Sequence, residues 1–186
     1  LADPETVKAI VKWSAEHFND DPRGGALHAN GTPGLVAPLQ AGGILPTHNF
    51  RSGAFDKAAQ IDHNVYNAEI LKSAGTCFAC AVRCKRDVEV DDGVYRVQRR
   101  FGGPEYETLG ALGSGLEVGN LKAIAAANQL CSQYGLDSIS AGVTLQFAME
   151  CYERGLLTKE DTGGLELRFG DEATVLRLLK MIAYRE

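Results

Sequence analysis

The sequence predicts a mostly α-helical, irregular multi-helix domain with Gly/Pro-rich loops and one small β-hairpin. Apolar residues recur at helical spacing along much of the chain, and one short segment alternates as strands do. Glycine makes up 21 of the 186 residues, well above its usual share of about 7%, which indicates many turns and loops. The length suits a single domain with one sizeable core.

The N-terminal half is predicted to contain two helices separated by a long loop region. The first covers 4–18, with Asp3 as its N-cap and Pro4 at its first position. Its apolar residues share one face: Val7, Ile10, Val11, Ala15 and Phe18. The Gly/Pro-rich segment 23–55 is predicted to be mostly loop, and 58–73 helical. The inward residues of that second helix are Ile61, Val65, Ile70 and Leu71.

The β-hairpin is predicted over 87–99, where valines and a tyrosine alternate around Asp92-Gly93, a favourable hairpin turn. Three helices follow. Asn120 caps the first, which Gly135 ends, and Leu121, Ile124, Ala125, Cys131 and Tyr134 form its inward face. The second covers about 140–154. Asp171 caps the third, whose inward residues are Leu176, Leu179, Ile182 and Ala183.

Charge and the chain ends limit the class of protein. The formal net charge of −5 argues against a general nucleic-acid or anionic-membrane binder, since both normally carry a basic excess. The uncharged stretch 24–50 contains three prolines and six glycines, so it is not a membrane helix. No signal-peptide pattern is present, and we expect a cytoplasmic protein. Both ends fall within helical patterns, which we interpret as a piece of a larger polypeptide, with a processed native chain as the alternative.

The most specific feature of the sequence is a cluster of three cysteines, Cys77, Cys80 and Cys84. Steps of three and four residues bring the thiols to one side of a helical turn or tight loop, as an iron–sulfur cluster requires. Positive charges at Arg83, Lys85 and Arg86 would stabilise thiolates and an anionic cluster.

Two other interpretations of the cysteine cluster stay open at this point. Cysteine packs well as a small apolar residue, and structural zinc also binds thiolates. The second Cys-x-x-Cys pair typical of zinc sites is missing. The remaining cysteines, Cys131 and Cys151, are predicted to be core residues, so the fourth cluster ligand is expected from sequence outside this chain.

Two further segments are candidates for function. Glu105 and Glu107 lie in a Gly-rich stretch, where a pocket would allow a general acid or base, although composition alone favours a solvated loop with surface glutamates. The turn around Gly135 joins two helices. It is either an ordinary helix cap or a site whose amides and carboxylate bind a polar heterocycle or an anion.

Taken together, these motifs strongly resemble the aldehyde:ferredoxin oxidoreductase family of tungsten or molybdenum pterin enzymes. The resemblance covers nearly the whole chain. It rests on Cys77-Phe-Ala-Cys80-x3-Cys84-Lys-Arg, Gly102-Gly-Pro-Glu-Tyr-Glu-Thr and Ala127-Asn-x-Leu-Cys-x-x-Tyr-Gly-Leu-Asp-Ser-Ile-Ser. Gly31-Thr-Pro and Gly43-Ile-Leu-Pro-Thr-His-Asn-Phe50 also match.

The resemblance implies specific roles for these residues. Cys77, Cys80 and Cys84 would ligate a [4Fe-4S] cluster, and Glu107 would transfer a proton or activate water near the metal. Gly135, Leu136 and Asp137 match a pterin-binding motif, with Ser132 where that motif usually has Asp or Asn. The chain would be the middle domain, 1–186, without its N-terminal and C-terminal domains, and inactive alone.

The resemblance also implies an activity and partners. Family members oxidise aldehydes to carboxylic acids at a tungsten or molybdenum held by two pyranopterins, and pass electrons through the cluster to ferredoxin. Expected partners are a small aldehyde, ferredoxin and the other domains of the parent chain, with a homodimer left open and no nucleic acid or membrane. The alternative is a non-catalytic iron–sulfur or zinc module for electron relay or docking.

Overall fold

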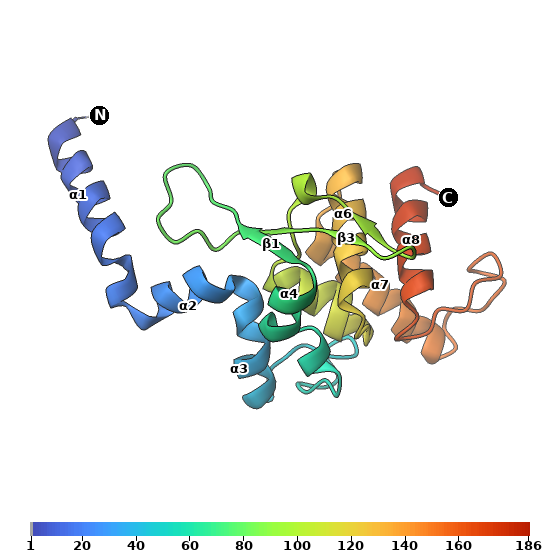
Figure 1. Ribbon diagram of the computed structural model, residues 1–186. Coiled ribbons are helices and arrows are strands. Elements are labelled where there is room, and N and C mark those ends of the chain that lie inside the picture. The colour runs from blue at the N-terminus through green and yellow to red at the C-terminus, as the bar shows by residue number, and fades with distance from the viewer. Residues whose placement is uncertain (1) are drawn as a thin grey trace.

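The computed structural model describes residues 2–186, which form a mostly helical domain with two short antiparallel strand pairs (Figure 1). This confirms the predicted fold class. The α-helices are α1 (Pro4–His17), α2 (Pro22–Asn30), α3 (Val36–Ala41), α4 (His63–Glu69), α5 (Tyr106–Thr108), α6 (Leu121–Tyr134), α7 (Ser138–Glu153) and α8 (Glu172–Tyr184). No helix in residues 2–186 is long and apolar enough to cross a membrane.

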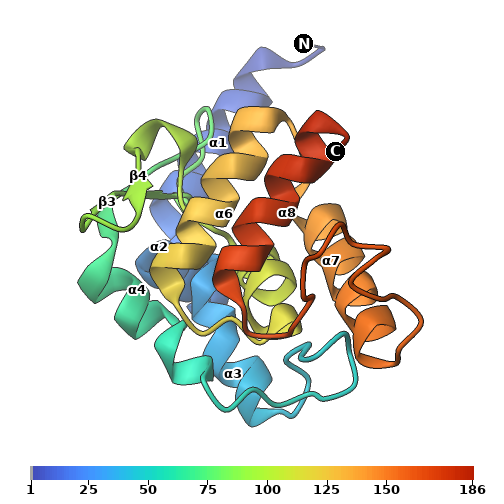
Figure 2. The same ribbon diagram turned by 90° about the vertical axis from the view of Figure 1, so that its right-hand side faces the viewer.

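Helices α6 and α8 begin at the polar caps that the sequence predicts, and α7 begins two residues earlier than predicted, after Asp137. Asn120 accepts hydrogen bonds from the amides of Lys122 and Ala123, while Asp137 and Asp171 cap α7 and α8 in the same way. Figure 2 shows α6 and α8 side by side, with α7 next to α8. These three helices form the framework on which the candidate site is built.

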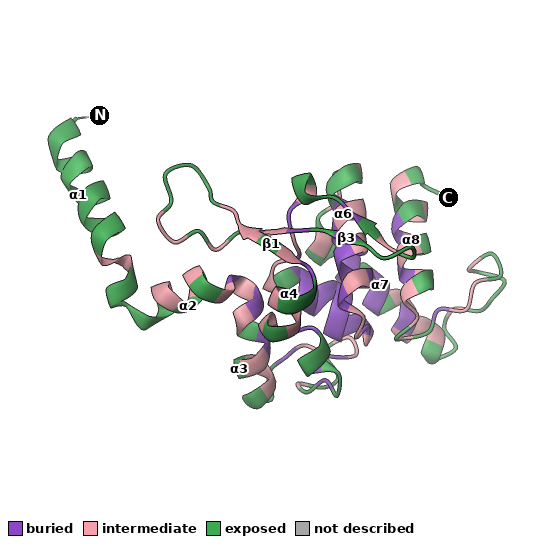
Figure 3. Cartoon of the chain, viewed as in Figure 1, coloured by how far each residue is buried: buried purple, intermediate pink, exposed green. Residues whose placement is uncertain are grey.

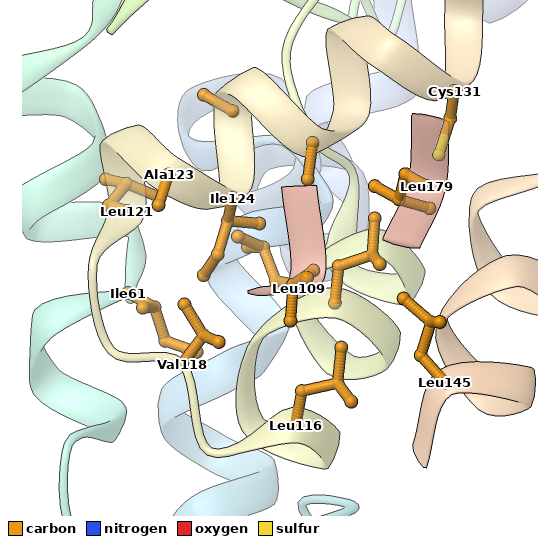
Figure 4. Packing of buried hydrophobic residues seen from close by; sticks show 14 of the residues in the cluster. Ile61, Leu109, Leu116, Val118, Leu121, Ala123, Ile124, Cys131, Leu145 and Leu179 are labelled. Carbon is orange, nitrogen blue, oxygen red and sulfur yellow. The ribbon is translucent and has the colours of Figure 1, made fainter. Parts of the chain in front are cut away.

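The hydrophobic core lies where α6 packs against α8 and a π-helical segment, η5 (Leu109–Gly113), packs against α7 (Figure 4). Four of the five predicted inward residues of α6 are buried, and Tyr134 is half-buried. In α8 the buried residues are Val175 and Leu179, whereas Ile182, predicted to point inward, is 38% exposed. Leu179 is thus buried as predicted and Leu176 packs against the core, while Val175 rather than Ile182 supplies the other buried position.

The strands confirm the hairpin and correct its bounds. Strands β3 (Val90–Asp91) and β4 (Arg96–Val97) pair around Asp92, whose carboxylate accepts the amides of Val94 and Tyr95. The predicted start of the hairpin instead belongs to β2 (Arg86–Val88), which pairs with β1 (Leu71–Ala74). The prediction of a helix through 73 is therefore wrong: α4 ends at Glu69, and the following residues form β1 because a partner strand distant in sequence lies beside them.

The Gly/Pro-rich segment 23–55 is more helical than predicted. Pro22 stands at the first position of α2 with Asp21 as its cap, and Pro38 lies in the first turn of α3. Proline is tolerated at both places because the amide it lacks has no partner within the helix there. Helix α1 projects from the domain, and none of its residues is buried (Figure 3).

Candidate functional site

The three clustered cysteines lie on the long loop between β1 and β2 (Figure 1). Cys77 and Cys80 are exposed, Cys84 is half-buried, and all three are free thiols. The amide of Cys80 donates to the carbonyl of Cys77 at 3.2 Å, so the first two cysteines share one tight turn. Phe78, between them, is fully exposed.

The donor set of this loop suits an iron–sulfur cluster. Three thiols fall within eight residues on a single exposed loop, and none of them is packed into a separate part of the core. Within residues 2–186, no three His, Cys, Asp or Glu side chains are grouped as a metal site requires, so the thiols share the loop without meeting at one point. Their role as ligands stays a prediction.

The other two cysteines differ from the loop cysteines. Cys131 is 2% exposed within the core, as predicted, and burial followed by the charge of Asp137 raises its pKa to about 11. Such a thiol is protonated and unreactive at neutral pH. Cys151, on α7, is half-buried rather than fully in the core.

The two glutamates of the Gly-rich stretch face different surroundings. Glu105 precedes α5 and accepts a hydrogen bond from the hydroxyl of Thr32, which in turn accepts the amide of Tyr106 at 2.9 Å. Glu107 is exposed and lines a surface cavity of about 160 Å³. The rest of the lining is nearly all apolar: Pro46, Phe50, Tyr106, Gly110, Ala111, Ile139, Val143 and Gln146.

The turn between α6 and α7 has the predicted cap geometry. Gly135 adopts φ 67° and ψ 31°, the left-handed conformation that favours glycine, and the amide of Leu136 donates to the carbonyl of Cys131 at 2.9 Å. The carboxylate of Asp137 accepts the amide of Ser140 at 2.7 Å, which lowers its pKa. Ser132, Gly135 and Asp137 are exposed, so their polar groups are accessible to a ligand.

Glu107 and the α6–α7 turn are neighbours. The hydroxyls of Thr108 and Ser138 lie 2.8 Å apart and join α5 to the start of α7, whose Ile139 and Val143 line the cavity beside Glu107. The end of the cysteine loop meets the other end of the same segment, where the amide of Gly103 donates to the carbonyl of Arg86 at 2.7 Å. Burial, and then the charge of Glu105, raises the pKa of Cys84. The Gly-rich stretch therefore links the cysteine loop to the cavity.

Phe50 lines the cavity, although the sequence predicts no role for it, and it is held by an unusual turn. His48, Asn49 and Phe50 all have positive φ, between 50° and 64°. Backbone amides of His48 and Asn49 donate to the carbonyls of Ser114 and Gly115. The only signal in the sequence is the match of 43–50 to the family motif.

The ring of His48 connects this turn to Glu117 and to Glu153 at the end of α7. Its nitrogens lie 2.8 Å from Glu117 and 3.1 Å from Glu153, and Arg51 also pairs with Glu153. The ring stacks on Phe169 with centroids 3.9 Å apart. Burial disfavours the charged ring, but the hydrogen bonds to the two carboxylates outweigh it and raise the pKa of His48 above its ordinary 6.5.

We expect the stabilisation that the His48 contacts contribute to decrease as pH rises. Because the folded pKa is raised, the stabilisation is complete below about pH 6.5 and is lost as pH rises through the folded pKa. The loss is ~1 kcal/mol or less, since both carboxylates are partly exposed. Unfolding midpoints from pH 5 to 9 for wild type and His48→Gln measure it. A pH dependence that survives in His48→Gln would contradict the assignment.

Comparison with known proteins identifies the family. A family model described as "Aldehyde ferredoxin oxidoreductase, domains 2 & 3" matches residues 9–186. The match covers most of the chain, which therefore belongs to the aldehyde ferredoxin oxidoreductase family.

Several curated relatives match the chain from end to end. The tungsten-containing aldehyde ferredoxin oxidoreductases of Thermococcus kodakarensis and Pyrococcus abyssi are 35% and 36% identical to it. A Pyrococcus furiosus protein named "Aliphatic sulfonate oxidoreductase, WOR-like subunit" is 32% identical over 76% of the chain and 22% of its own length. The chain spans 30% of the length of the first two relatives.

Proposed function

We propose that this chain is the middle domain of a cytoplasmic tungsten or molybdenum pterin enzyme that oxidises aldehydes to carboxylic acids. The observation that carries the proposal is Glu107 at the edge of an apolar cavity, beside the α6–α7 turn. The matched relatives, tungsten-containing aldehyde ferredoxin oxidoreductases, support it. Since they are more than three times longer, the activity belongs to the full-length protein.

The oxidation converts an aldehyde and water into a carboxylic acid, two protons and two electrons. The bound metal–pterin centre supplies the acceptor for those electrons. Glu107 takes up a proton as water adds, because it is the carboxylate that lines the cavity. The apolar walls bind the hydrocarbon part of the aldehyde and exclude water from it.

The α6–α7 turn is suited to hold one pterin. Gly135 and Leu136 offer their backbone carbonyls, and Ser132 offers a hydroxyl. Asp137 keeps its carboxylate ionised through its hydrogen bond to Ser140. Exposed polar groups of this kind recognise a polar heterocycle through paired hydrogen bonds. The second pterin would contact domains outside this chain.

The cysteine loop would hold a [4Fe-4S] cluster that passes the electrons to ferredoxin. Cys77, Cys80 and Cys84 supply three thiolates, and the remaining domains of the parent chain supply the fourth ligand. A non-catalytic iron–sulfur or zinc module is the competing proposal. Tungsten or molybdenum with pterin in the full-length protein would support the enzyme, and their absence would support the non-catalytic module.

The cluster prediction is tested by Cys80→Ser in the anaerobically purified full-length protein. We expect the electron paramagnetic resonance signal of the reduced cluster to be lost, because a ligand is removed. Cys151→Ser is the matched control and should retain the signal, since Cys151 lies on α7, outside the loop. A wild-type protein without iron, or a Cys80→Ser protein with an unchanged signal, would contradict the proposal.

A further inference from the structure

Arg86, two residues after Cys84, carries a buried charge. It is 1% exposed. One terminal nitrogen of its guanidinium donates to the carbonyls of Arg83 and Lys85 at 3.1 and 3.4 Å. The other donates to the carbonyls of His28 and Leu27 at 2.7 and 3.3 Å.

The guanidinium lacks both a full set of partners and a counter-charge. Its Nε is buried without a hydrogen-bond acceptor. Among residues 2–186, no carboxylate forms an ion pair with it, and its hydrogen-bond partners are all neutral carbonyls. An arginine cannot shed its proton to escape this environment, so the charge remains.

The backbone of α2 and of the cysteine loop packs closely around the Arg86 side chain. Gly31, at the end of α2, has φ 62°, and a Cβ there would lie 2.7 Å from the Cys84 carbonyl and 2.9 Å from the Arg86 Nε. The ring of His28 lies 2.8 Å from the carbonyl of Val82. Helix α2 is thus fastened to the last turn of the loop, and Arg86 bridges the carbonyls on both sides of Cys84.

The protein groups nearby compensate the charge only in part. The carbonyl end of α2 favours a cation, which explains why His28 and Leu27 are its partners. Glu105 is close enough to raise the pKa of Cys84, but its hydrogen bond goes to Thr32 and not to Arg86. A buried cation without an anion is costly, and this one lies at the third cysteine of the loop.

We propose that Arg86 is the counter-cation of the iron–sulfur cluster and a positioning residue for Cys84. The inference rests on the proposed function, since it needs a cluster on the loop. A thiolate-ligated cluster is anionic and gains one more negative charge on reduction. A fixed positive charge beside it therefore stabilises the reduced form and raises the reduction potential.

The test is a redox titration of the full-length protein, with the cluster signal followed by electron paramagnetic resonance. Arg86→Gln, which removes the charge and keeps hydrogen-bond donors, should lower the ratio of reduced to oxidised cluster at a fixed potential at least tenfold. For a one-electron couple this corresponds to about 59 mV. Arg86→Lys keeps the charge and should shift the ratio less.

Lys85→Met is the matched control because it removes the same charge from the adjacent, exposed residue. Its shift should be small and should shrink in high salt, since exposed charges are screened. A shift in Arg86→Gln no larger than in Lys85→Met would overturn the inference.

A second measurement needs no variant and covers the case in which Arg86→Gln does not fold. The wild-type potential should change little between low and high salt, because a buried charge is poorly screened. A large fall with salt would assign the effect to exposed cations and overturn the inference. A wild-type protein without a cluster would instead overturn the proposed function itself.

Discussion

Replacing Glu107 by glutamine in the full-length protein is expected to lower kcat for aldehyde oxidation by ~10²–10⁴-fold, the usual contribution of a general acid or base. Glutamine keeps the shape of the side chain and cannot exchange a proton. Because Glu107 is exposed and lies outside the core, the variant should fold and retain its iron and tungsten. Steady-state kinetics measures kcat, and metal analysis of the same samples measures their iron and tungsten content.

Glu105→Gln is the comparison that separates the two carboxylates of this segment. Glu105 bonds to Thr32, away from the cavity lining, so its removal should cost far less in kcat. A larger loss in Glu105→Gln than in Glu107→Gln would transfer the proton-handling role to Glu105. If both variants keep the kcat of the wild type, neither glutamate takes part in the reaction.

Filling the cavity is expected to change which aldehydes react. An apolar cavity of about 150 Å³ accommodates benzene, so the cavity beside Glu107, at about 160 Å³, has room for a phenyl or a short branched chain. Val143→Phe places a ring in that space. We expect kcat/KM for benzaldehyde to fall about 10- to 200-fold, and kcat/KM for acetaldehyde to change little.

Phe147→Ala is the control for this variant, because Phe147 lies on α7 but is 65% exposed and does not line the cavity. It should leave the ratio of the two kcat/KM values unchanged. Equal losses for both aldehydes in Val143→Phe would mean that the substrate chain does not occupy the cavity.

The sequence predicts helix ends well where a single side chain decides them. Asn120 and Asp171 each cap the helix that follows, and Gly135 ends α6, because capping depends on a few adjacent residues. The sequence fails where distant segments compete. Leu71 has an apolar helical neighbourhood, yet it joins a strand because residues 86–88 lie beside it.

The candidate site also has parts that local sequence predicts and parts that depend on contacts between distant segments. The cysteine loop, Glu107 and the α6–α7 turn are visible as local motifs. The cavity walls come from 46–50, 106–111 and 139–146, and the contacts of Arg86 join α2 to residues 83 and 85. Spacing along the chain carries no information about contacts between distant segments, so neither the cavity nor the burial of the Arg86 charge was predictable.

Under the proposed function, the turn shared by Cys77 and Cys80 sets the order in which the loop could be oxidised or loaded with a cluster. Two solvent-facing thiols three residues apart in a tight turn are within the span of a disulfide. An oxidant that arrives before iron and sulfide would couple them and leave Cys84 alone. Loading of the proposed cluster would therefore need a reducing milieu, and once air has closed that bridge, a reductant would have to precede reconstitution.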